Sequence, residues 1–241
     1  MSALVSILLN FNQTLARELQ IFLLLWRYQH RAPRLTLWWR LMLKRVVDLV
    51  LSAAALMTCW PVWCLIALVV KLDSKGPAMY TQERMGRLCE PFKIYKFRTM
   101  RVDAEAAGPR WAASDDDPRM TRVGRFLRRT HLDELPQLLN VLKGDMSLVG
   151  PRPERPEFVQ RLQQDIRGYD ERLLIKPGMT GLAQVHYRYD QSLADVKQKV
   201  RFDLLYVKRL CLALDLRILA WTVLVVCTGR GVKSSRSRVL C

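Results

Sequence analysis

The sequence predicts an α+β protein, predominantly helical, that is attached to a membrane from one side. Residues 49–70 form a run of about 22 positions without a charged side chain, which is the length of a membrane span, and Pro61 lies near its middle. Residues 78–82 and 92–97 are short, aromatic-rich runs joined by a polar turn, a pattern typical of a small β-hairpin. Longer runs of mixed charge follow and indicate amphipathic helices.

The apolar segment is predicted to be a kinked, re-entrant helix. Pro61 lacks an N–H and kinks a helix, and it stands between two tryptophans, which prefer a membrane interface to the bilayer centre. Lysines and arginines flank the segment on both sides, which favours a cytoplasmic location for both ends. A single crossing does not satisfy this pattern unless a second crossing elsewhere in the chain returns it to the same side. The alternative is a buried helix of a soluble core, which would need cover on every side.

The two ends of the chain are predicted to lie at the membrane surface. The apolar runs 3–9 and 21–26 are too short to span a bilayer, and either an interfacial amphipathic helix or a helix that docks on the domain or mediates self-association explains them. Residues 212–226 suit an interfacial helix that leads into the basic tail 230–238.

The charge implies an anionic partner. The 241 residues are 50% hydrophobic, yet they carry a formal net charge of +17. Membrane lipid, nucleic acid and a phosphorylated substrate all fit such a surface. The 6 cysteines show no metal-ligand spacing and are expected to be reduced.

Residues 131–153 are the predicted reaction centre. Asp133 and Glu134 precede a run with leucines at helical spacing, Pro136 belongs to a first helical turn, and Gly144 suits a left-handed helix end. The helix is therefore expected to begin at about Asp133 or Glu134, with both acids at its positive pole.

Two interpretations of these acids are open. The ordinary one makes Asp133 an N-cap and Glu134 a first-turn acid. The other rests on nearby cations, including Arg128 and Arg152, which would keep a carboxylate ionised and able to attack phosphorus. Lys93, Lys96 and Arg98, in the second strand, would hold phosphate oxygens or simply form a solvated strand face.

Six motifs follow one another along about residues 44–230. They are KRVVD at 44–48, the apolar segment broken at Pro61, YTQERMG at 80–86, FKIYKFRTM at 92–100, LDELPQLLNVLKGDMSLVGPRP at 132–153 and KPGMTGLAQV at 176–185. In this order they resemble the bacterial sugar transferase family, the monotopic phosphoglycosyl transferases that start surface-glycan assembly on a polyprenyl phosphate carrier. Smaller relatives often have serine before the membrane-segment proline, where this chain has Trp60.

The resemblance implies an architecture and a reaction. The expected parts are an N-terminal interfacial extension (1–43), a re-entrant membrane helix (44–73) and a catalytic domain on the cytoplasmic face with a C-terminal interfacial helix (74–241). The location that the resemblance implies is the bacterial inner membrane. The reaction moves a phospho-sugar from a UDP-sugar to undecaprenyl phosphate, giving undecaprenyl diphosphate sugar and UMP, with Mg²⁺ as cofactor.

The resemblance also assigns roles to residues. Asp133 matches the family's nucleophile, which would form a covalent phosphosugar enzyme. Glu134 matches its partner, which would bind metal or assist the acceptor, and both acids are the expected metal ligands. The residues expected to bind substrate are Lys93, Lys96, Arg98, Arg128, Arg152, Gln184 and Arg188.

Two other classes of function fit parts of the sequence. A membrane-tethered nucleic-acid-binding protein would explain the basic charge, although no reading motif is visible and nucleic acid is not expected as a partner. The other class is a scaffold that recruits partners to the membrane. In such a protein, Asp133 and Glu134 would serve only to cap a helix. The sequence leaves the sugar and the oligomeric state open.

Overall fold

The computed structural model describes residues 16, 18–20, 22–26, 34–105, 117–187 and 193–228. This part of the chain is mostly helical and contains two small sheets of two strands each. The elements are α2 (Arg34–Asp73), β1 (Met79–Met85), the 3-10 turn η1 (Arg87–Cys89), β2 (Pro91–Phe97), α3 (Arg122–Thr130), the 3-10 turn η2 (Leu132–Glu134), α4 (Gln137–Lys143), β3 (Ser147–Val149), α5 (Pro156–Asp165), η3 (Tyr169–Leu174), β4 (Gly178–Thr180), α6 (Leu182–His186), α7 (Leu193–Lys208) and α8 (Leu212–Thr228).

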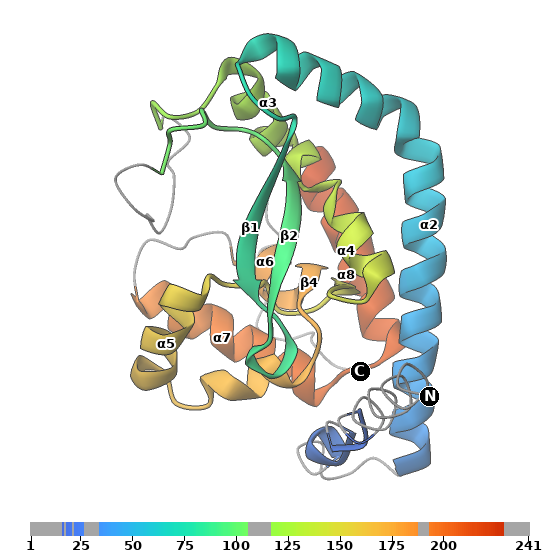
Figure 1. Cartoon of the computed structure of the whole chain (residues 1–241). Helices are drawn as coiled ribbons and strands as arrows, with labels where there is room; N and C mark the ends of the chain where they lie inside the picture. The colour runs from blue at the N-terminus through green and yellow to red at the C-terminus, as the bar shows by residue number, and fades with distance from the viewer. Residues whose placement is uncertain are drawn as a thin grey trace, which may run out of the picture.

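Helix α2 is long, apolar and bent. It has 40 residues, and Figure 1 shows it running along one side of the molecule and then turning over the top towards α3. Pro61 lies inside it and removes one helical hydrogen bond, while the Thr58 hydroxyl donates to the Ala54 carbonyl oxygen at 2.9 Å, a contact that also bends helices.

The outer side of α2 is not covered by the described part of the chain. Among the described residues, α2 is the one helix long and apolar enough to cross a membrane. Met57, Trp60, Leu65 and Leu72 are each at least 60% exposed. The alternative of a helix buried in a soluble core is therefore wrong, and the exposed apolar face indicates membrane association.

The KRVVD motif fastens the first half of α2 to the domain. The Lys44 ammonium donates to the Val149 carbonyl oxygen at 3.0 Å and forms a buried ion pair with Asp215 of α8 at 2.9 Å. One turn further along α2, the Asp48 carboxylate accepts the Leu148 N–H at 3.1 Å. A lysine and an aspartate four residues apart thus join α2 to β3 and α8.

Removal of the Lys44 ammonium should destabilise the protein strongly. In Lys44→Ala, Asp215 would remain 3% exposed without its cation, and we expect a loss of about 3–5 kcal/mol in the free energy of unfolding. Thermal unfolding in detergent, followed by circular dichroism, measures it. Lys71→Ala, which removes an exposed lysine from the same helix, is the control. Equal stability of the two variants would contradict the assignment.

The described part of the N-terminal extension docks on the domain. Residues 18–20 and 22–26 are helical, Leu25 is 2% exposed within the main core, and Glu18 forms an ion pair with Arg87. Of the two alternatives for this region, the contacts favour a docked helix. Leu19 and Leu23 remain exposed and are still available to a membrane surface. The predicted run 3–9 lies outside the described residues.

The β-hairpin forms as predicted, and its register matters for the site. Strands β1 and β2 pair antiparallel, with Tyr80 opposite Lys96 and Gln82 opposite Ile94. The parallel pair of β3 and β4 was not expected from the sequence, since each strand has only three residues.

The later helices agree in part with expectation. The region 154–172, expected as one helix, is α5 followed by η3, while 192–210 and 212–226 form α7 and α8. The main core lies between α2, α4, α7 and α8 and includes Val141, Val207, Leu214 and Ile218. The basic tail 230–238 lies outside the described residues.

Candidate active site

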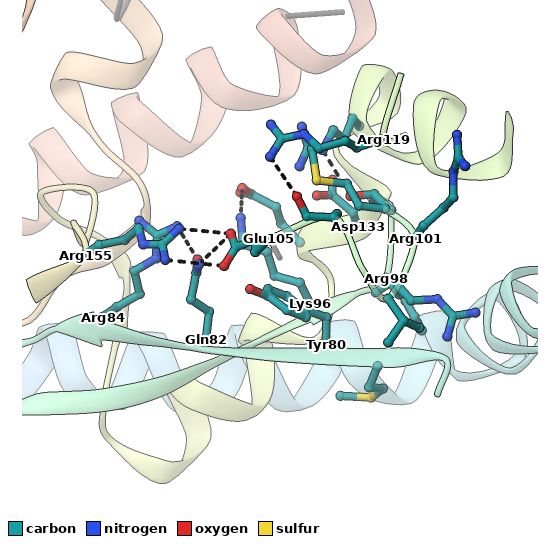
Figure 2. Close-up of a pocket in the computed structure, with 18 of the residues that line it drawn as sticks. Tyr80, Gln82, Arg84, Lys96, Arg98, Arg101, Glu105, Arg119, Asp133 and Arg155 are labelled. Carbon is teal, nitrogen blue, oxygen red and sulfur yellow. Dashed lines mark hydrogen bonds and ion pairs between the residues drawn. The ribbon is translucent and has the colours of Figure 1, made fainter. Parts of the chain in front are cut away.

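A basic cavity of about 560 Å³ opens between the hairpin, the chain that follows it, α3, η2 and the loop after β3. Figure 2 shows its side chains, with Asp133 towards one end and Glu105 and Arg155 towards the other. Asp133 and Glu134 both line it, and so do Lys96, Arg128 and Arg152. Most of the residues expected to act together from the sequence are thus gathered around one concavity.

Asp133 and Glu134 lie in η2, before helix α4 and not in its first turn. His131 ends α3 in a left-handed conformation (φ 58°), η2 follows, and α4 starts only at Gln137 with Pro136 at its N-cap. The expected helix start at Asp133 or Glu134 is therefore wrong. Neither carboxylate makes a capping hydrogen bond within the described chain, so the explanation of the pair as helix capping fails.

The carboxylate of Glu134 bridges two cations. Its Oε1 accepts from the Lys96 ammonium at 3.0 Å and from the Arg152 guanidinium at 2.8 Å. Burial would raise the pKa of Glu134, but the charges of Arg152 and Lys96 outweigh burial and hold the pKa well below its usual range. Glu134 therefore stays ionised and holds both cations beside Asp133.

Asp133 has a different environment. It is 7% exposed and makes no hydrogen bond or ion pair with another described residue. Burial raises its pKa, and the Lys96 charge opposes this only in part. The nearby cations were expected to keep a carboxylate of this pair ionised, and Glu134 is the acid that contacts Lys96 and Arg152 directly. Adjacent carboxylates whose pKa values are pushed apart are suited to different roles. Asp133 is uncommitted in the sense that, unlike Glu134, it has no hydrogen bond or ion pair with a described residue.

Asn140 fixes the position of η2 and α4 against the hairpin. Its side chain is fully buried, accepts the Tyr95 N–H at 3.0 Å and donates to the Lys93 carbonyl oxygen at 2.8 Å. At the other end of α4, Gly144 provides the predicted left-handed cap (φ 95°) and the Arg45 guanidinium donates to the Val141 carbonyl oxygen at 2.7 Å. These contacts bring Glu134 to Lys96.

Arg152 is held by close backbone packing between the GPRP and KPGMTG motifs. The Gly178 N–H donates to the Pro151 carbonyl oxygen at 2.9 Å, and a Cβ atom on Gly178 would lie 2.0 Å from the Gly150 nitrogen. The buried Arg172 guanidinium donates to the Arg152 carbonyl oxygen at 2.8 Å. The glycines of both motifs are needed for this approach.

Arg128 reaches the cavity because α3 packs tightly on the chain after β2. A Cβ atom on Gly124 would lie 2.0 Å from the Thr99 carbonyl oxygen, and the Thr121 hydroxyl caps the helix by accepting the Gly124 N–H at 2.9 Å. The Arg128 Nε donates to the Thr99 hydroxyl at 3.0 Å. Arg128 lines the cavity from this position.

Four of the predicted substrate-binding residues are placed differently or not described. Lys93 is exposed and does not line the cavity, because alternation along β2 sends it to the other side from Lys96. Gln184 donates to the Met179 carbonyl oxygen at 2.9 Å, away from the cavity. Arg98 lines the cavity, but its guanidinium donates to the Ser74 carbonyl oxygen at 2.7 Å, beyond the end of α2. Arg188 lies outside the described residues.

Several cavity residues were not singled out from the sequence. Tyr80, Gln82 and Arg84 alternate along β1 and line the cavity together, so the strand periodicity could have identified them. Glu105 and Arg155 come from separate loops and form an ion pair at 2.9 Å. No local sequence pattern predicts this contact.

The carboxylates of Asp133 and Glu134 suit Mg²⁺ only if substrate phosphates supply further ligands to the same ion. Within the described ranges, no group of three or more histidine, cysteine, aspartate or glutamate residues could hold a metal. Mg²⁺ is commonly bound by one or two carboxylates together with substrate phosphates, and the uncommitted Asp133 beside Glu134 matches that arrangement.

The chain belongs to the bacterial sugar transferase family, whose model matches residues 39–229. It is 46% identical over 157 residues to a putative undecaprenyl-phosphate N-acetylgalactosaminyl 1-phosphate transferase of Bacillus subtilis, covering 65% of this chain and 83% of the relative. It is 40% identical to a UDP-N-acetylgalactosamine-undecaprenyl-phosphate N-acetylgalactosaminephosphotransferase of Aeromonas hydrophila, covering 79% and 45%. A UDP-glucose:undecaprenyl-phosphate glucose-1-phosphate transferase of Escherichia coli is 45% identical, covering 76% and 39%. The chain thus spans less than half the length of the last two relatives.

Proposed function

We propose that the protein transfers a sugar phosphate from a UDP-sugar to undecaprenyl phosphate, producing undecaprenyl diphosphate sugar and UMP. The observation that carries the proposal is the uncommitted carboxylate of Asp133 in a basic cavity, beside a Glu134 that binds Lys96 and Arg152. The family and the printed activities of the relatives support the substrate class.

The proposed reaction has two displacements at one phosphorus. An Asp133 oxygen attacks the phosphorus that carries the sugar, and the bond to UMP breaks, so that UMP leaves with the bridging oxygen. An oxygen of undecaprenyl phosphate then attacks the same phosphorus, and the bond to Asp133 breaks. Lys96, Arg128 and Arg152 would balance the charge of the phosphate oxygens. Mg²⁺ held by Asp133 and Glu134 would add to this neutralisation.

The proposed membrane arrangement follows from the two ends of α2. Lys44 and Asp48, just before the charge-free run 49–70 of this helix, contact β3, while the Ser74 carbonyl oxygen just after the helix accepts from Arg98, which follows β2. Both ends of the charge-free run are thus attached to the same domain, and a helix that is fixed in this way does not place them on opposite faces of a bilayer. We infer a re-entrant helix, with the cavity on the cytoplasmic face of the inner membrane.

An assay of the unmodified protein tests the function. Membranes or detergent-solubilised protein, incubated with undecaprenyl phosphate and each of a panel of UDP-sugars, should release UMP with at least one sugar, and removal of divalent metal with EDTA should stop release until Mg²⁺ is restored. No UMP from any UDP-sugar would contradict the proposal. Salt-sensitive DNA binding unaffected by UDP-sugars would instead favour the nucleic-acid alternative.

A further inference from the structure

The cavity is divided into a cationic end and a neutral end. At the Asp133 end, the three cations Lys96, Arg128 and Arg152 stand against the two carboxylates of Asp133 and Glu134, which leaves an excess of positive charge. At the other end, Arg155 is paired with Glu105 at 2.9 Å and Arg84 with Glu154 at 3.9 Å, so the charges balance. Phosphate oxygens are favoured at the first end, and an uncharged part of the substrate is favoured at the second.

Glu105 is an oriented but accessible carboxylate. Its two oxygens accept from the Arg155 guanidinium at 2.9 and 3.4 Å, and Oε1 also accepts from the Gln82 amide at 3.4 Å, as Figure 2 shows. The Arg155 side chain is 12% exposed, whereas that of Glu105 is 41% exposed. The carboxylate is thus held by its described neighbours: Oε1 accepts two hydrogen bonds and Oε2 one, and the two contacts at 3.4 Å are long enough for a ligand hydroxyl to replace them.

A carboxylate at this place would repel a phosphate, but it suits vicinal hydroxyl groups. Two neighbouring hydroxyls can both donate to one carboxylate, and an acidic side chain recognises ribose hydroxyls in this way in dinucleotide-binding folds. The pair with Arg155 compensates the charge of Glu105, so that the two side chains together add no net charge to that end.

The spacing along β1 puts Glu105 close to Lys96, the residue expected to contact the phosphates. Tyr80 lies directly opposite Lys96, and Gln82, which contacts Glu105, is the next residue of β1 on the same side. Two residues of a strand span about 6.8 Å. A ring bonded to the reacting diphosphate is therefore within reach of Glu105.

We propose that Glu105, oriented by Arg155 and Gln82, is a specificity-determining residue that accepts hydrogen bonds from vicinal hydroxyls of the donor. This inference rests on the proposed function. Two parts of a UDP-sugar carry such hydroxyls next to a phosphate, the ribose and the transferred sugar, and the chemistry of recognition is the same for both.

The test compares Glu105→Gln with a matched control. Glu157→Gln removes a carboxylate that also pairs with Arg155, at 3.6 Å, but lies outside the cavity lining and is 56% exposed. We expect Glu105→Gln to lower kcat/KM for the UDP-sugar by about 10- to 100-fold, the effect of losing hydrogen bonds to a charged group, and Glu157→Gln to leave it unchanged. Both variants should show the circular dichroism of the wild type.

Two readouts distinguish the source of the hydroxyls. If they belong to the ribose, wild type and Glu157→Gln bind UMP more tightly than 2′,3′-dideoxy-UMP in calorimetry, and Glu105→Gln loses this preference. If they belong to the transferred sugar, the nucleotide preference is retained and the ranking of UDP-sugars by kcat/KM changes. The inference is overturned if Glu105→Gln alters neither, or if Glu157→Gln has the same effect. Calorimetry needs no turnover, so failure of the proposed function, seen as absent UMP release by the wild type, is a separate result.

Discussion

We expect the Asp133→Asn variant to release UMP from a UDP-sugar about 10⁴-fold or more slowly than the wild type. The amide has nearly the shape of the carboxylate but is a far weaker nucleophile. Because Asp133 makes no hydrogen bond or ion pair with another described residue, its replacement breaks no observed contact. The loss should therefore appear in kcat, measured as UMP release under saturating donor and acceptor, with membrane association and thermal stability retained.

Asp103→Asn is the matched control. It makes the same chemical change on an exposed residue near the cavity that does not line it. We expect wild-type rates from this variant. If Asp133→Asn turned over as fast as Asp103→Asn, the assignment of Asp133 as nucleophile would be wrong.

The second large effect is expected from Glu134→Gln, which should lower kcat by about 100-fold. The glutamine keeps the size of the side chain but removes the charge that Lys96 and Arg152 share at 3.0 and 2.8 Å. The two cations would then lose their common position beside Asp133. Steady-state kinetics of UMP release measures the change, and Glu83→Gln, on the exposed side of β1, is the control.

A pH profile separates this electrostatic role from a merely structural one. Burial lowers the pKa of Lys96, and the negative charge of Glu134 raises it again. Loss of that charge lowers the pKa of Lys96 further, so the ammonium deprotonates at a lower pH. The alkaline limb of the rate profile should therefore move to lower pH in Glu134→Gln and stay in place in Glu83→Gln. An unmoved limb would contradict a direct electrostatic contact between Glu134 and Lys96.

Local patterns predicted the elements that depend on neighbouring residues. The hairpin follows from the strand pattern and its polar turn, the end of α4 from Gly144, and the bend in α2 is consistent with Pro61. The error over the start of α4 has a local cause as well. The left-handed His131 ends α3 at once and leaves only a 3-10 turn for Asp133 and Glu134 before Pro136.

The site depended more on long-range contacts, which patterns do not reveal. The basic neighbours of the acid pair were visible in the sequence. That Glu134 bridges two cations while Asp133 has no such contact depends on Lys96 of β2 meeting Arg152 of the loop after β3. The same holds for Glu105, whose partner Arg155 lies 50 residues away in the chain. Lys93 was grouped with Lys96 because both are basic, although strand alternation separates them.

The central claim is that Asp133 carries the sugar phosphate between donor and acceptor. Mass spectrometry of the intact protein, after incubation with a UDP-sugar and Mg²⁺ but without undecaprenyl phosphate, tests it most directly. We predict a mass gain of one sugar phosphate, located on the peptide with Asp133, absent from Asp133→Asn and discharged when undecaprenyl phosphate is added. UMP release without such an adduct, or an adduct on another residue, would contradict the account.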